Sequence, residues 1–62
     1  MSKNQIKELQ TQLRQLEDEH EALEEEFYRT QEAGEPTDDI EFQLASIEVL
    51  MGELEIELEV LR

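Results

Sequence analysis

Apolar side chains recur at regular intervals through the first half of the chain. Their spacing alternates between three and four residues, with His20 and Thr30 as two polar members of the series: Ile6, Leu9, Leu13, Leu16, His20, Leu23, Phe27 and Thr30. This is the heptad repeat of a helix that packs against another helix, with Ile6 at position a and Leu9 at position d. Glu and Gln, which favour helices, occupy most of the other positions. The pattern predicts a helix over about residues 3–33.

The same repeat returns in the second half, entered at position d. Its members are Ile40, Leu44, Ile47, Met51, Leu54, Leu58 and Leu61. Between the two repeats, Gly34 suits the left-handed residue that ends many helices, and Pro36 cannot continue a helical hydrogen-bond ladder. Acidic residues follow at Asp38 and Asp39, where the dipole of a new helix favours negative charge. We therefore expect a turn at 34–37 and a second helix over about 38–62.

The two repeats stay in step when the chain folds back on itself. Thr30 then faces Ile40, Leu16 faces Leu54, and the pairing continues to Leu9 and Leu61. The predicted fold is all-α: a single domain over residues 1–62 that forms an antiparallel two-helix hairpin, or coiled coil. A pairing shifted by half a heptad and a single continuous helix are the alternatives.

Length and charge limit what such a hairpin can be. A 62-residue domain without cysteine has no disulfide and no zinc–thiolate site to stabilise it, so helix packing and oligomerisation are expected instead. The formal net charge of -13 disfavours direct contact with nucleic acid or with anionic lipid, and favours a protein partner with a basic surface. A need for solubility or high salt would explain the charge equally. Because no apolar run suits a signal peptide or a membrane span, we expect a cytoplasmic location.

The second predicted helix carries an additional apolar stripe outside the heptad seam. Its members are Phe42, Ala45, Val49, Gly52, Ile56 and Val60. A single hairpin partner covers only the a and d positions, so this stripe would face water in a monomer. We predict that it is the interface of a homodimer, which would form a four-helix bundle. The alternative is a set of tolerated surface apolar residues.

His20 is the one histidine, at a core a position. Together with Glu17 it forms the Glu-x-x-His spacing found in di-iron carboxylate bundles, and two copies with Glu48 or Glu55 could complete a metal site. However, Glu17 does not lie on the seam. The alternative is a polar residue that fixes register and oligomeric state, and we expect no metal or other cofactor.

Carboxylates crowd the middle of the first predicted helix between Glu17 and Glu26. They could form a docking surface, a mimic of nucleic acid charge or simply a solvated face. Two pairs at helical spacing would compensate part of this charge: Arg14 with Asp18, and Glu25 with Arg29. No set of residues typical of a nucleophilic enzyme or a phosphate-binding loop is present, so we expect a non-enzymatic protein.

The turn and the start of the second helix run Gly34-Glu35-Pro36-Thr37-Asp38-Asp39-Ile40-Glu41-Phe42-Gln43-Leu44-Ala45. This segment resembles the hairpin tip of Gre-type transcript cleavage factors, where Gly-Asp-x-x-Glu-Asn-x-Glu-Tyr-x-x-Ala joins two long antiparallel helices. The resemblance covers residues 34–45 and implies a tip that enters the secondary channel of RNA polymerase. The carboxylates at the two matching positions, Glu35 and Asp38, would help to hold a catalytic magnesium ion there, with Asp39 and Glu41 beside them. A capped acidic turn explains the same residues as an alternative.

Overall fold

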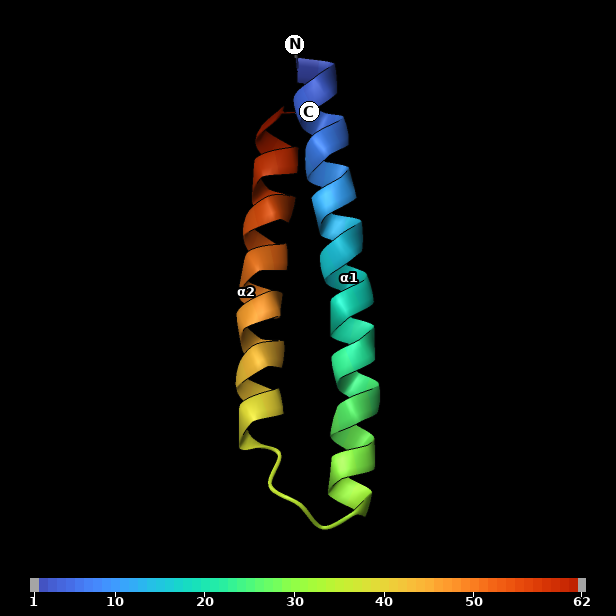
Figure 1. The fold of residues 1–62 in the computed structure, drawn as a ribbon. Coiled ribbons are helices and arrows are strands. Elements are labelled where there is room, and N and C mark those ends of the chain that lie inside the picture. Colours follow the sequence, from blue (N-terminus) through green and yellow to red (C-terminus); the bar gives the residue numbers. More distant parts are fainter. Residues whose placement is uncertain (1, 62) are drawn as a thin grey trace.

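Two long helices account for nearly all of the protein. The computed structural model describes residues 2–61, and within them α1 spans Ser2–Glu32 and α2 spans Asp38–Leu61. Figure 1 shows the two helices side by side and antiparallel, with the start of α1 and the end of α2 at one end of the hairpin and the turn at the other. The molecule measures 49 × 14 × 11 Å, and 31 helical residues at about 1.5 Å each account for the long axis. The predicted all-α hairpin is confirmed, and a single continuous helix is excluded.

The end of α1 is fixed by the backbone of the turn. Gly34 has a φ of +74°, which is the left-handed conformation expected of it. Its amide donates to the carbonyl of Gln31, and the amide of Glu35 donates to the carbonyl of Thr30, both at 3.0 Å. This pair of bonds is the Schellman motif, which satisfies carbonyls that the end of a helix would otherwise leave unpaired. The helix therefore ends one residue before the predicted Ala33.

The start of α2 is fixed by Thr37. Its carbonyl accepts from the amide of Glu41 at 2.9 Å, which is the first helical hydrogen bond of α2. Its hydroxyl donates to the carboxylate of Glu41 at 3.1 Å. Asp38, Asp39 and Glu41 make the first turn acidic, as the helix dipole favours. The observed start at Asp38 matches the prediction, whereas the predicted final residue, Arg62, lies outside the described residues.

The core is the single seam between the helices, in the predicted register. Ile40, Ile47 and Leu58 are buried, and every other described seam residue is half-buried. Leu16 and Leu54 line one hollow, as expected for facing residues, and Phe27 with Leu44 and Leu9 with Leu61 do the same elsewhere along the seam. No described side chain is fully enclosed, because a two-helix unit covers each seam residue from one side only. Neither α1 nor α2 combines the length and apolar character needed to cross a lipid bilayer.

Candidate interaction surfaces

The additional stripe of α2 lies on the outside of the hairpin. Its four large members are Phe42, Val49, Ile56 and Val60, with exposures of 74%, 61%, 65% and 79%. Ala45 is also exposed, and Gly52 is half-buried. We call these six residues the outer stripe. Packing against α1 therefore does not cover the face of α2 that the sequence predicts to be an interface.

The charge on this face differs from the charge on the rest of the protein. Between Phe42 and Gly52, the positions of α2 that face away from the seam hold only Ala45, Ser46 and Val49, all uncharged. The corresponding face of α1 carries charged residues along its length, including Lys7, Arg14, Asp18, Glu21, Glu25 and Arg29. In a chain with 18 acidic residues, this uncharged segment lets another apolar surface approach without an immediate repulsive contact.

Gly52 is not required by the hairpin itself. A β-carbon built at this position would meet no atom of the described residues within 4 Å, so alanine would fit without strain. Glycine in a helix interior costs about 1 kcal/mol relative to alanine. In the described hairpin no close packing at Gly52 offsets that cost, whereas close approach by a second helix would.

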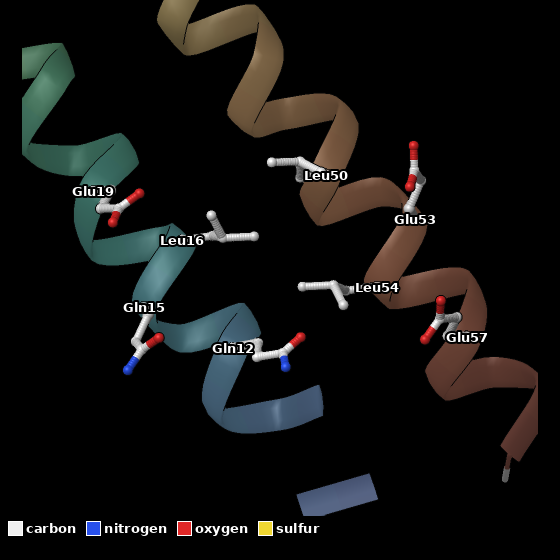
Figure 2. Close-up of a pocket in the computed structure, with 8 residues that line it drawn as sticks. All are labelled: Gln12, Gln15, Leu16, Glu19, Leu50, Glu53, Leu54 and Glu57. Atoms are coloured by element: carbon white, nitrogen blue, oxygen red, sulfur yellow. The ribbon is translucent and has the colours of Figure 1, made fainter. Parts of the chain in front are cut away.

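A groove runs along one edge of the seam and has an apolar floor. Figure 2 shows Leu16 of α1 and Leu50 and Leu54 of α2 pointing into the space between the helices. The groove has a volume of about 290 Å³ and is rimmed by polar and acidic side chains: Gln12, Gln15, Glu19, Glu53 and Glu57. We call this the leucine groove. Among the described residues that line it none is basic, so the charge that they contribute is entirely negative.

Sequence reasoning missed Leu50, which is 48% exposed and belongs to neither the seam nor the outer stripe. It occupies heptad position g, beside the seam, where Gln43 and Glu57 stand one repeat earlier and later. A leucine at a position otherwise filled by polar residues was the signal that could have found it.

His20 connects the two helices through a pair of carboxylates. Its Nε2 lies 2.9 Å from the Glu48 carboxylate of α2, and its Nδ1 lies 3.5 Å from the Glu24 carboxylate one turn further along α1. The hydrogen bond to Glu48 is the largest influence raising the pKa of His20 above its ordinary value of 6.5, and the nearby negative charge of Glu24 adds to it. The side chain is 22% exposed, so this a position is not sealed from water.

Within one chain this geometry does not assemble a metal site, and the site suggested by the sequence would need two copies. The hydrogen-bond and ion-pair partners of His20 are Glu24 and Glu48, whereas no hydrogen bond or ion pair with Glu17 is present among the described residues. The Nδ1 atom faces Glu24 and the Nε2 atom faces Glu48, on opposite sides of the ring. One metal ion bound to either nitrogen would therefore not reach both carboxylates. Within residues 2–61, no group of three histidine or acidic side chains is arranged to hold a metal ion.

The carboxylates along α1 are exposed, as a solvated face would be. Of the two predicted compensating pairs, Glu25 and Arg29 approach to 3.8 Å with both side chains largely exposed. The other pair, Arg14 with Asp18, does not form an ion pair in the described part of the chain. Exposed pairs of this kind contribute little to stability.

The acidic tip consists of Glu35, Asp38, Asp39 and Glu41, and all four side chains are exposed. They lie at the end of the hairpin opposite the start of α1 and the end of α2, as Figure 1 shows for the turn between the two helices. The hydroxyl of Thr37 holds the carboxylate of Glu41. The other three carboxylates of the tip make no hydrogen bond or ion pair with described side chains.

No family model, curated protein or solved structure matches this chain.

Proposed function

We propose that this protein is a non-enzymatic acidic helical hairpin that acts through protein–protein contacts and forms a homodimer through its outer stripe. The observation that carries the proposal is the exposure of Phe42, Val49, Ile56 and Val60 on the one outer face that also contains an uncharged segment. Soluble proteins seldom leave a continuous apolar row uncovered unless it binds something. In the proposed dimer, the two hairpins form a four-helix bundle with α2 of each copy at its centre.

The size of the row suits a dimer. With four large side chains exposed by 61% to 79%, the outer stripe offers on the order of 500 Å² per copy, or about 1,000 Å² in the pair. That is near the lower limit for a specific interface. Full burial of one valine, isoleucine or phenylalanine contributes about 1.5–3 kcal/mol, and the two copies supply eight such side chains, mostly exposed at present. This gain can exceed the cost of association, which is on the order of 10 kcal/mol.

The direct test adds one charge to the row. Val49→Glu and Ile56→Glu would each place a carboxylate in the centre of the interface, and we expect both variants to sediment as monomers where the unmodified chain is a dimer. Glutamate favours helices more than valine or isoleucine, so the hairpin itself should remain folded. Ala22→Glu is the matched control, because it adds the same charge at an exposed position of α1. Variants that keep the mass of the unmodified dimer would refute this interface.

We further propose that the partner of the hairpin presents a basic amphipathic helix to the leucine groove. Leu16, Leu50 and Leu54 form an apolar floor for the nonpolar side of such a helix, and the carboxylates of Glu19 and Glu57 on the rim complement flanking lysine or arginine. A second copy of this chain does not suit the groove, since it would bring further carboxylates to a negative rim.

A short synthetic helix of leucine and lysine is a suitable probe of the groove. We expect it to bind the hairpin in a fluorescence anisotropy titration, more weakly as salt is raised, while a helix of leucine and glutamate does not bind. Leu50→Gln should weaken binding several-fold, because about half of that side chain is available for burial. Equal binding of the two synthetic helices, or no effect of Leu50→Gln, would contradict this assignment.

The acidic tip supports a second candidate function, that of a Gre-like hairpin in the secondary channel of RNA polymerase. The observation in its favour is that Glu35 and Asp38 are exposed at the free end of a narrow two-helix rod. In that setting they would share a magnesium ion with the polymerase, since magnesium needs few ligands from any one protein. Transcript cleavage by polymerase supplemented with the hairpin, lost in Asp38→Asn and retained in Ala22→Glu, is the expected result. Absence of any binding to polymerase would remove this candidate.

A further inference from the structure

The outer stripe has nearly the same spacing in both directions from Val49. Phe42 lies seven residues before it and Ile56 lies seven residues after it, so all three fall on one line along α2. The two small residues flank the same centre, with Ala45 four residues before and Gly52 three residues after. An interface between identical copies related by a two-fold axis requires this kind of self-complementary pattern.

A two-fold axis at Val49 pairs the stripe with itself when the two α2 helices are antiparallel. In that arrangement Val49 meets Val49 of the second copy, Phe42 meets Ile56, and Ala45 lies within one residue of the level of Gly52. The bulkiest side chain is opposite a smaller one, and the two small residues lie next to the axis, where they allow the backbones to approach closely. The parallel arrangement would instead place two phenylalanine rings at one level and two glycines at another, so the distance between the helices would be uneven.

Charge favours the antiparallel arrangement as well. The acidic residues on the outer face of α2 are Asp38, Asp39, Glu53 and Glu59. In a parallel pair each of these would lie level with its own copy, giving four like-charged pairs. In the antiparallel pair Glu53 lies level with Ala45, while Asp38 and Asp39 both lie within one residue of the level of Glu59 of the second copy, so the like-charged contacts are confined to the two ends of the pair. The helix dipoles also oppose one another, which is the favourable arrangement for neighbouring helices.

We infer that two copies of this chain pair through antiparallel α2 helices about a two-fold axis at Val49. This inference rests on the proposed self-association and specifies its geometry. Because both hairpins then point in opposite directions, the assembly presents one acidic tip at each of its ends. A dimer of this shape has two separated copies of every remaining surface, including the leucine groove, and can engage two partner molecules.

Cysteine cross-linking tests the orientation directly, because the chain has no cysteine of its own. Three exposed positions of the stripe are changed one at a time: Phe42→Cys, Val49→Cys and Ile56→Cys. Under mild oxidation we expect Val49→Cys to form a covalent dimer by itself. Phe42→Cys and Ile56→Cys should each cross-link poorly alone, since the two copies of either residue would be about 21 Å apart along the helix axis, beyond the reach of a disulfide.

A mixture of Phe42→Cys and Ile56→Cys provides the decisive sample. With a cleavable tag on one of the two chains, the mixed dimer has a mass of its own on a non-reducing gel, and we expect it to be the main product. Ala22→Cys, on the exposed face of α1, measures the background of random collisions. Circular dichroism of the reduced variants checks that each still forms the hairpin.

Two different failures can be told apart. If Phe42→Cys and Ile56→Cys each form dimers with themselves and the mixture yields no excess of the mixed product, the helices are parallel. The proposed orientation is then wrong, although self-association stands. If no variant exceeds the Ala22→Cys background and the unmodified chain sediments as a monomer, both the orientation and the proposed dimer are overturned.

Discussion

The contribution of the seam to stability can be measured by shortening two leucines of the same helix. Leu58 is the most enclosed side chain described, at 4% exposure, whereas Leu50 at 48% is only half covered. Replacing either with alanine removes the same atoms from α2 and leaves a residue that favours helices more. The difference between Leu58→Ala and Leu50→Ala therefore reports burial in the seam.

The expected magnitudes follow from the two exposures. Removing three buried carbon groups at about 0.8 kcal/mol each costs Leu58→Ala about 2.4 kcal/mol, and a partial cavity brings the loss to about 3 kcal/mol. The seam is one layer deep, so neighbouring side chains can relax into part of the space. Leu50→Ala should lose about 1 kcal/mol, because nearly half of the leucine already faces water. A 62-residue domain has a total stability of roughly 3–9 kcal/mol, so the loss in Leu58→Ala should remove at least about a third of the stability of the hairpin.

Urea denaturation followed by the helical circular dichroism signal is the appropriate assay, with all proteins at one concentration. In thermal melts the losses correspond to a lowering of the melting temperature by roughly 12–24 °C for Leu58→Ala and about 4–8 °C for Leu50→Ala. Equal losses for the two variants would refute the packing described for the seam. A larger loss at Leu50 would show that the helices are rotated relative to the structure.

Three further predictions concern pH, the turn and salt. The pKa of His20 is raised in the folded protein, so its interaction with Glu48 stabilises the fold when the ring is protonated. This stability is fully present below the unfolded pKa of about 6.5, and it is lost as the pH rises through the higher folded pKa. Urea denaturation should thus show a more stable protein at about pH 6 than at about pH 8, with a smaller difference in His20→Gln; an unchanged difference would contradict the role of His20. Gly34→Ala should lower the free energy of unfolding by about 1–2 kcal/mol because its φ is positive, whereas Gly52→Ala should not destabilise the hairpin at concentrations where it is monomeric. Added sodium chloride should raise the melting temperature by screening repulsion among the carboxylates, and a decrease would contradict the self-repulsion expected of a net charge of -13.

The fold was predictable because its main determinants are periodic and local. The a and d positions define the seam without knowledge of any distant contact, and Gly34 with Pro36 marks the reversal. The register follows because the turn is short. The predicted end of α1 was one residue too late. The hydrogen bonds of the Schellman motif, rather than helix propensity, make Glu32 the last helical residue.

The surroundings of individual side chains were less predictable. Sequence spacing paired Glu17 with His20, but the ring contacts Glu48 on the opposite helix and Glu24 one turn along its own helix. Spacing alone cannot specify the rotation of a ring at the seam or the neighbour offered by the other helix. Leu50 was not predicted for a related reason. It lies beside the a and d positions, and its place in the leucine groove depends on the spacing of the two helices along that edge of the seam.

The outer stripe was visible in the sequence because it repeats every seven residues, and the structure leaves it exposed on the outside of α2. Exposure alone does not identify what covers the stripe, since that depends on a contact between molecules. The uncharged segment around Val49 and the unneeded glycine at position 52 support a second copy over a basic partner at this face.

Sedimentation equilibrium of the unmodified protein, over a wide range of concentrations at physiological salt, tests this central claim most directly. One chain has a mass of 7.3 kDa, and we predict that the measured mass rises from this value to twice this value as the concentration increases. A mass that stays at 7.3 kDa at every concentration would contradict the proposed dimer.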